Sequence, residues 1–391
     1  MRRWWKPLVT LTAAGTLLAG TATVQASATG GDKEWIAQTF PSGNARLQDA
    51  ARVDVDTTWA VGWRQYGEGR QRSSGPVMFS HDDGTPDWRE IPVPTGLSSV
   101  RTVTAGPAGS VWVAGSKPWG AESIPTAAFD GGWHVRQAPA PAGSWAAGFR
   151  GLAAIADNDV WAVGWWQPAE YLTFHGLIQH WDGSAWQQIQ PPVIDSDYWT
   201  LSGVVATAAD DIWASGTVGT EEGRRRPLLL HYDGDAWARV AAPDVEGING
   251  EFYDLAATGP DDVWAVGTEE TVGGQGEDRG LIAHFDGNRW TKVDSGTRPG
   301  GWHAVSTGPS GVAVVGTRFL AHKGTYEPIG MTRTDTGWQT MLLPAGDGPE
   351  GRSPTAVVSA GRTLTVVGMA PQGEAENGEP VPPMPFALSR G

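Results

Sequence analysis

Short apolar runs of four to six residues, separated by polar and glycine-rich stretches, recur along nearly the whole chain. One unit shows the pattern well, with runs at 151–156, 160–164, 177–181 and 185–190, each bounded by turn-forming residues. Runs of this length and bounding are typical of β-strands, and no helical periodicity accompanies them. The unit therefore predicts four short antiparallel strands.

Two motifs within this unit repeat with a steady period. The first reads Asp-Val-Trp-Ala-Val-Gly at 159–164, and its tryptophan position recurs at Trp59, Trp112, Trp161, Trp213, Trp264, Ala313 and Thr365, 49 to 53 residues apart. The second reads Asp-Gly-x-x-Trp at 182–186, and its final position recurs at Trp35, Trp88, Trp133, Trp186, Trp237, Trp290 and Trp338. Seven copies of a four-stranded unit with this period predict an all-β, seven-bladed β-propeller.

The two ends of the repeat indicate how the ring closes. Trp35 precedes any copy of the first motif, and the chain ends at 385–389, where the third strand of the seventh unit belongs. We therefore expect the N-terminal segment to supply the outer strand of the last blade, which leaves no long unpaired edge. The expected domain is a single propeller over residues 29–391.

The repeated residues themselves are expected to be structural. Twelve of the 22 tryptophans occupy the two motif positions, where large rings would wedge between adjacent blades. The Asp-Gly pairs at 83–84, 130–131, 182–183, 233–234 and 286–287 predict tight two-residue hairpins, since glycine tolerates the positive φ angles of such turns.

These motifs resemble those of the tryptophan-rich secreted propeller proteins of actinobacteria, a largely uncharacterised family. The resemblance runs from Trp35 onward, is strong in the units around Trp161, Trp213 and Trp264, and fades in the last two units. It implies a propeller fold and export from the cell. More distantly, the chain is similar to kelch, galactose-oxidase-like and Asp-box sialidase-like propellers, although the turn at 182–186 is one residue shorter than an Asp-box.

The N-terminus predicts an export signal. Arg2, Arg3 and Lys6 precede an apolar run at 8–24, and small residues at 26–28 suit cleavage, so residues 1–28 are expected to be a signal peptide. We expect a secreted, extracellular protein with no membrane insertion, because no later apolar run is long enough to span a bilayer. The formal net charge of −15 argues against nucleic acid as a partner, and a monomer is expected.

The connections between second and third strands are long and varied, whereas the hairpins at the opposite face are short and uniform. This difference predicts one working face, which should carry aromatic rings able to stack on sugars or grip a protein. The ligand-binding candidates among these rings are Trp63, Trp119, Trp165, Trp166, Tyr198 and Trp199. The alternative is that the rings only pack the loops together.

Residues at the start of each first strand should surround the mouth of the axial channel. Counting ten residues back from the first-motif position gives Asp49, Thr102, Gly151, Gly203, Asp254, His303 and Thr355, preceded by Gln48, Arg101, Arg150, Ser202, Tyr253, Trp302 and Pro354. Asp49, Asp254 and His303 are the candidate catalytic residues, and Arg101, Arg150, Tyr253 and Trp302 are further ligand-binding candidates. The alternative is that channel mouths are polar in any case.

Other chemistries find little support in the sequence. Without cysteine there is no thiolate chemistry and no Cys–Tyr copper cofactor, and the eight histidines form no metal cluster. Ca²⁺ is possible, but the paired aspartates lack the spacing of a calcium loop, so no cofactor is expected. The leading hypothesis is a non-catalytic propeller that binds an extracellular glycan or protein. A glycan-active hydrolase or lyase is the alternative, and a structural wall or spore-coat protein is a third.

Overall fold

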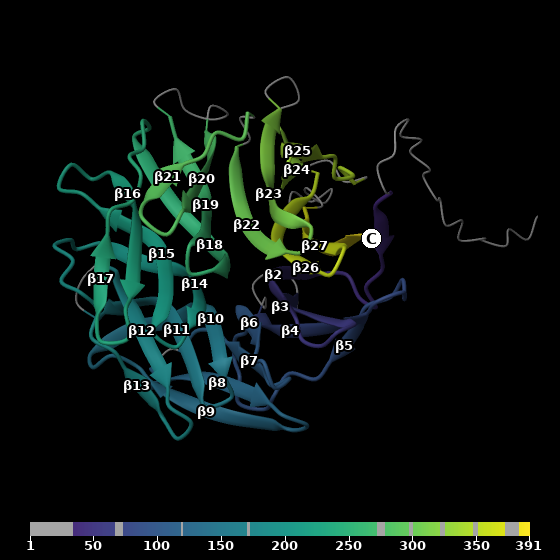
Figure 1. The fold of residues 1–391 in the computed structure, drawn as a ribbon. Helices are drawn as coiled ribbons and strands as arrows, with labels where there is room; N and C mark the ends of the chain where they lie inside the picture. Colours follow the sequence, from purple (N-terminus) through teal and green to yellow (C-terminus); the bar gives the residue numbers. More distant parts are fainter. Residues whose placement is uncertain are drawn as a thin grey trace, which may run out of the picture. The chain divides into compact units, whose positions relative to one another are not determined.

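The described chain is all-β. The computed structural model describes residues 34–66, 73–118, 120–169, 173–271, 278–296, 300–320, 325–346, 351–371 and 383–391. Within these ranges there are 28 strands and no helix, and the strands form seven four-stranded antiparallel sheets. The first strands of the sheets gather around a common axis (Figure 1). The predicted seven-bladed β-propeller is confirmed.

Each blade runs from an inner strand at the axis to an outer strand at the rim. Blade 1 contains β2 (Ala45–Arg52), β3 (Thr57–Tyr66), β4 (Ser73–Asp82) and β5 (Arg89–Ile91). Blade 2 contains β6 (Thr102–Ala105), β7 (Val111–Ala114), β8 (Ser123–Phe129) and β9 (Trp133–Pro139). Blade 3 contains β10 (Ser144–Ala156), β11 (Asp159–Pro168), β12 (His175–Trp181) and β13 (Trp186–Gln188).

The next three blades follow the same order. Blade 4 contains β14 (Trp199–Ala208), β15 (Asp211–Gly219), β16 (Arg225–Tyr232) and β17 (Trp237–Val240). Blade 5 contains β18 (Asn249–Gly259), β19 (Asp262–Glu270), β20 (Arg279–Phe285) and β21 (Trp290–Lys292). Blade 6 contains β22 (Gly301–Gly308), β23 (Gly311–Leu320), β24 (Thr325–Thr334) and β25 (Gly337–Met341).

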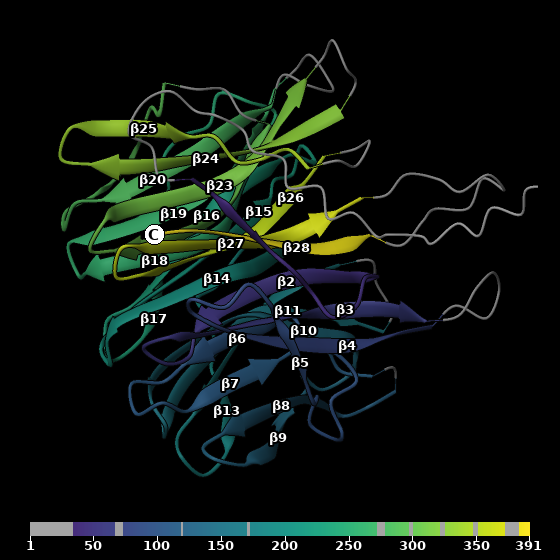
Figure 2. The ribbon, with the colours of Figure 1, turned by 90° about the vertical axis from the view of Figure 1, so that its right-hand side faces the viewer.

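Blade 7 is closed by the N-terminal strand, as predicted. Its inner strand is β26 (Ser353–Ala360), followed by β27 (Thr363–Ala370) and β28 (Met384–Arg390), and its outer strand is β1 (Ile36–Gln38). Strand β1 pairs antiparallel to β28, with Gln38 opposite Ala387. Figure 2 shows β28 beside β27 at the C-terminal end of the chain. The predicted signal peptide, residues 1–28, lies outside the described residues, so it stays a prediction, as does the domain start at residue 29.

Two local predictions are wrong. The second and third strands extend further than expected, so Trp63 lies on β3, where it pairs with Pro76, and Trp165 lies on β11, where it pairs with Gly176. The Asp-Gly pairs do not form two-residue hairpins: in blade 3, Trp181 pairs with Trp186 across four residues. The glycines have positive φ as expected (91° at Gly183), but the turn is held by an Asp side chain that accepts N–H groups two and three residues ahead.

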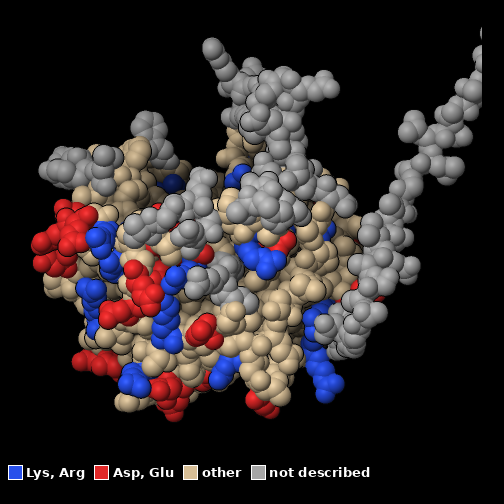
Figure 3. All heavy atoms as spheres, turned by 90° about the horizontal axis from the view of Figure 1, so that it is seen from above, with Lys and Arg blue, Asp and Glu red and all other residues tan. Residues whose placement is uncertain are grey.

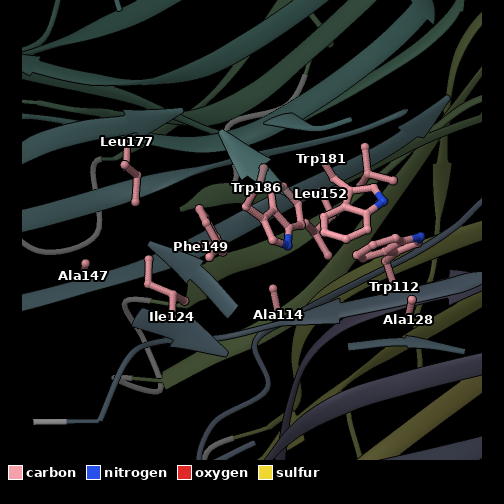
Figure 4. Packing of buried hydrophobic residues seen from close by; sticks show 13 residues of the cluster. Trp112, Ala114, Ile124, Ala128, Ala147, Phe149, Leu152, Leu177, Trp181 and Trp186 are labelled. Carbon is pink, nitrogen blue, oxygen red and sulfur yellow. The ribbon is translucent and has the colours of Figure 1, made fainter. Parts of the chain in front are cut away.

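The repeated tryptophans pack between blades. Each first-motif tryptophan touches the second-motif tryptophan of the following blade, with ring centroids 5.4–5.9 Å apart: Trp59–Trp133, Trp112–Trp186, Trp161–Trp237, Trp213–Trp290 and Trp264–Trp338. In Figure 4, Trp112 and Trp186 lie in the cluster that joins blades 2 and 3. Eight of the twelve repeat tryptophans are buried, and Trp35, Trp59, Trp133 and Trp338 are partly buried. The predicted structural role is confirmed.

Three histidines of the repeat support these tryptophans. In blade 3, His180 stacks on Trp161 with 4.4 Å between ring centroids, and its Nε2 lies 2.7 Å from Oδ1 of Asp159. His231 and His284 make the same two contacts in blades 4 and 5. A polar partner on one side and a ring face on the other fix each histidine in place, so these residues belong to the frame of the blade.

Trp302, a ligand-binding candidate, is instead a core residue. Its side chain is fully buried in the cluster that joins blades 5 and 6. Its indole nitrogen is buried without a hydrogen-bond partner among the described residues.

We expect Trp302→Phe to lower the free energy of unfolding by about 1–2 kcal/mol, because the lost ring volume is partly offset by removing an unsatisfied N–H. Thermal and urea unfolding would measure the loss. Trp145→Phe is the control, since Trp145 is 52% exposed. An unchanged stability for Trp302→Phe, together with weakened ligand binding, would contradict the core placement.

Residues Trp35–Gly391 form one compact unit. None of the described residues belongs to a helix long and apolar enough to cross a membrane.

Candidate functional site

The seven inner strands enclose an axial channel. Its cavity has a volume of about 320 Å³ and is lined by consecutive residues from every inner strand, from Gln48 on β2 to Val357 on β26. Contacts between successive inner strands run around the whole ring, including β26 with β2. The inner strands therefore form a continuous wall around the channel, and a few positions on each strand determine the chemistry of its lining.

A β-bulge near the start of the inner strand aims one residue per blade at the channel mouth. In blade 3 the register skips Arg150, between the pairs Phe149–Gly164 and Gly151–Val163. Equivalent skips occur in blades 1, 4, 5, 6 and 7, and Arg101 directly precedes β6 in blade 2. These positions form the mouth ring: Gln48, Arg101, Arg150, Ser202, Tyr253, His303 and Thr355.

The glycine that ends the first motif is required by this bulge. A Cβ on Gly164 would lie 2.0 Å from the carbonyl oxygen of Gly148, and one on Gly267 would lie 1.8 Å from that of Glu251. The equivalent glycines of the other five blades face the same backbone collision, at 1.9–2.3 Å. The repeating glycine therefore marks in the sequence the place where the inner strand bulges toward the axis.

In blades 1 to 5 the mouth ring consists of the residues that precede the counted positions, whereas in blades 6 and 7 it consists of the counted positions His303 and Thr355 themselves. In blade 5, Trp264 pairs with Ala256, eight residues earlier, whereas in blade 6 Ala313 pairs with Ser306, seven residues earlier. Blades 3 to 5 carry a second bulge at the far end of the inner strand, and blades 6 and 7 do not. His303 and Thr355 therefore belong with Arg101 and Arg150, and Trp302 turns into the core.

Asp49 and Asp254 lie one residue deeper, in blades 1 and 5, and connect adjacent blades. Asp49 accepts hydrogen bonds from the N–H of Val103 (3.0 Å) and the hydroxyl of Thr102 (2.8 Å) on β6. Asp254 accepts one from the N–H of Val305 on β22 (2.9 Å). Each also accepts the N–H of the residue that follows it.

The two carboxyls hold protons more tightly than an ordinary aspartate. Burial raises the pKa of Asp49 to about 6, against the hydrogen bonds from Val103, Thr102 and Ala50. Burial likewise raises the pKa of Asp254 to about 7, and the charge of Asp49 adds to the effect. Both groups thus titrate near neutrality within one cavity.

His303 and Tyr253 occupy neighbouring positions of the mouth ring. The Nδ1 of His303 lies 2.8 Å from the carbonyl oxygen of Pro354, and its Nε2 lies 3.5 Å from the hydroxyl of Thr317. Burial lowers the pKa of His303, which favours the neutral ring. Tyr253 is 36% exposed, and burial together with the charge of Glu251 raises the pKa of its phenol.

Arg101 and Arg150 make the opposite side of the ring basic. Among the described residues neither has a carboxylate within 4.0 Å, whereas Arg52 pairs with Asp83 and Arg64 with Glu90 at 2.6 and 2.8 Å. Both side chains reach solvent, yet surrounding protein lowers the pKa of each, and the charge of Arg101 further lowers that of Arg150. Figure 3 shows acidic and basic side chains interspersed over one face of the molecule. Arg101 and Arg150 thus give this side of the mouth ring two guanidinium groups with no acidic partner among the described residues.

A groove opens beside the channel mouth on the face of the second-to-third-strand connections. It has a volume of about 310 Å³ and shares Gln48 and Arg101 with the channel lining. The remaining lining residues are Trp63, Ser74, Gly75, Pro76, Ser98 and Ser99. The guanidinium of Arg46 lies 5.3 Å from the centre of the Trp63 ring. Trp63 thus lies in a recess that combines its ring with serine hydroxyls and the Gln48 amide.

The other aromatic candidates have mixed placements. Trp165 contacts Phe174, and Phe174 contacts Tyr198, each at 5.6 Å between centroids, and the phenol of Tyr198 interacts electrostatically with Arg150. These rings form a row that leads to the basic side of the mouth.

Two further candidates pack into the protein. Trp166 is half-buried against the core between blades 2 and 3, and Trp199 is buried in the core between blades 3 and 4. Trp199 is therefore a core residue. Trp119 lies outside the described residues.

The described residues contain no group of three or more histidines, aspartates or glutamates positioned to hold a metal ion. The aspartates of the turns between the first two strands make structural hydrogen bonds: Oδ1 of Asp157 in blade 3 accepts one from Ser110 in blade 2 (2.5 Å), and Asp159 bonds to His180 within blade 3.

Sequence reasoning did not identify the groove residues Ser74, Ser98 and Ser99, or the ring partner Arg46. The sequence did contain a signal for Ser98 and Ser99, because both lie in the connection that leads to Arg101, on the predicted ligand-binding face. What was missing was the extension of β3 and β4, which brings Trp63 and Ser74 next to that connection.

No family model matches this chain, and no curated protein matches it. Among solved structures, it is similar to a protein of unknown function from Dyadobacter fermentans, with 15% identity over 92% of this chain and 98% of the other and a TM-score of 0.51. It is similar to the phage phi92 endosialidase, with 9% identity over 92% and 69% and a TM-score of 0.53. It is also similar to the propeller domain of the Trilobed protease from Pyrococcus furiosus, which has an open velcro topology, with 10% identity over 86% and 94% and a TM-score of 0.52. These similarities show the propeller fold.

Proposed function

We propose that this chain is a secreted, non-catalytic binding propeller that recognises an extracellular carbohydrate or protein through the face around the channel mouth. The observation that supports this most is the pair Arg101 and Arg150, which line the channel without a carboxylate partner among the described residues. Arg101 also lines the Trp63 groove. Cationic groups beside a partly exposed ring and small polar side chains suit capture of a ligand rather than bond cleavage.

The contacts of the candidate catalytic residues also favour binding. Asp49 and Asp254 each use their oxygens to hold neighbouring inner strands together, and His303 directs its ring nitrogens at Pro354 and Thr317. A general acid or base needs an atom free to reach the reacting group. Here those atoms already serve the wall of the channel.

To test the proposal, the protein would be applied to arrays of immobilised glycans and extracellular proteins. We expect binding that is weakened about tenfold or more by Trp63→Ala or Tyr198→Ala. The control is Asn288→Ala, an exposed residue of a hairpin on the opposite face. Binding that is lost with Asn288→Ala and kept by the other two variants would place the working face on the other side.

A glycan-active hydrolase or lyase is the second candidate, because two carboxyls with pKa values of about 6 and 7 share one cavity with His303. The same fold occurs in an endosialidase and in the propeller domain of a protease, so the fold does not choose between binding and catalysis. Incubation with the sugars of the array would reveal any turnover. Turnover that survives the double variant Asp49→Asn/Asp254→Asn would remove these residues from any catalytic role.

A further inference from the structure

The basic side of the mouth ring brings two guanidinium groups together. Arg101 and Arg150 come from neighbouring blades and line one cavity. Desolvation of each guanidinium by the surrounding protein lowers its pKa. The charge of Glu251 attracts Arg150 and partly raises its pKa, but the Glu251 carboxylate is already paired with Arg225 at 2.7 Å. Two partly desolvated guanidinium groups side by side repel each other, and a carboxylate bound between them would relieve the repulsion.

The adjoining groove has the chemistry of a sugar subsite. Its lining combines one flat ring, Trp63, with the hydroxyls of Ser74, Ser98 and Ser99 and the amide of Gln48. Sugar hydroxyls pair with such groups, and the C–H face of a pyranose stacks on an indole. A peptide anchor would need an apolar pocket, and only Trp63 and Pro76 offer apolar side chains here.

We propose that this site takes the acidic terminal residue of a glycan, with its carboxylate between Arg101 and Arg150 and the adjoining sugar ring against Trp63 in the groove. This inference rests on the proposed binding function and names its ligand class. The net charge of −15 further restricts the ligand, since a long polyanion would be repelled by the rest of the surface, whereas a single acidic end would not.

The test uses the full protein and an array of oligosaccharides that end in glucuronic, galacturonic or N-acetylneuraminic acid, each beside its carboxyl-reduced counterpart. Titration calorimetry on the best-bound pair gives dissociation constants. We expect the acidic member to bind about ten- to a hundredfold more tightly, which is the usual worth of a charged hydrogen bond. Arg101→Ala or Arg150→Ala should abolish that difference, and Trp63→Ala should weaken both members alike.

Arg289→Ala is the matched control, because it removes the same charge from an exposed hairpin on the opposite face and should leave the preference intact. Equal binding of acidic and reduced glycans, with no effect of the arginine variants, would overturn the acidic-sugar inference while leaving the binding function in place. Binding only to peptides through a free carboxylate would also overturn it. Absence of binding to every glycan and protein tested would instead count against the proposed function itself.

Discussion

Removing residues 34–40 should lower the free energy of unfolding by about 5 kcal/mol or more, and the melting temperature by roughly 10 °C. This segment contains β1, the outer strand of blade 7, and it also reaches blade 1. Gln38 accepts a hydrogen bond from the indole of Trp88 (2.9 Å), and Phe40 stacks on the same indole at 5.3 Å. The deletion therefore uncovers the edge of β28 and opens the junction between the first and last blades.

Thermal unfolding followed by circular dichroism would measure the loss, with light scattering to detect association through the exposed β28. Ile36→Ala is the matched control from the same strand, because Ile36 is 60% exposed and its replacement should change stability by less than about 0.5 kcal/mol. An unchanged melting temperature for the deletion would mean that the closure contributes nothing to the fold.

Stability should fall by about 4 kcal/mol between pH 5 and pH 8 because of Asp49 and Asp254 together. Their pKa values rise from 3.8 to about 6 and about 7 on folding. Between the unfolded and folded values the native state binds more protons than the unfolded chain. The stabilisation is therefore complete below about pH 4 and is lost as the pH rises through the folded pKa values.

Urea unfolding at intervals across this pH range would give the slope. The double variant Asp49→Asn/Asp254→Asn should flatten it, since an amide does not titrate, whereas Asp235→Asn on an exposed hairpin should leave it as it is. Carboxylates whose pKa is lowered, such as Glu90 beside Arg64, lose their contribution only at more acidic pH and do not interfere. His303, whose pKa is lowered by burial, changes stability in the opposite direction, so the comparison between the wild type and the double variant isolates the two carboxyls. An identical slope in both proteins would show that both carboxyls fold in the ionised form.

The fold could be predicted from the sequence because the repeat carries its own geometry. Trp161 and Trp186 recur because each must reach a partner in a neighbouring blade, and the motif glycine recurs because the inner-strand backbone fills the space of its Cβ. The closure followed from counting, since Trp35 is an outer-strand residue without a preceding blade. These features are set locally and recur in five to seven blades, so one misread copy does not alter the result.

The site was harder to predict because it depends on departures from the repeat. A fixed count of ten residues grouped His303 with Asp49 and placed Trp302 at the mouth. The count fails because blades 3 to 5 contain a second bulge that adds one residue, and blades 6 and 7 lack it. Trp199 was also misplaced. The sequence around an aromatic residue next to a connection does not indicate whether its ring faces the solvent or packs against the next blade. Only the three-dimensional packing distinguishes these two placements.

The bulges separate the residues that line the channel mouth from the residues that keep the blades packed. The seven side chains of the mouth ring stand outside the strand ladders, and the core residues that precede them, such as Phe149, keep the blades packed. Exchange of a ring residue such as Arg150 therefore leaves the register unchanged, whereas His303 and Thr355 also bond to the backbone of neighbouring strands. A library that varies the mouth-ring residues would therefore change the chemistry of the channel mouth while keeping the propeller frame.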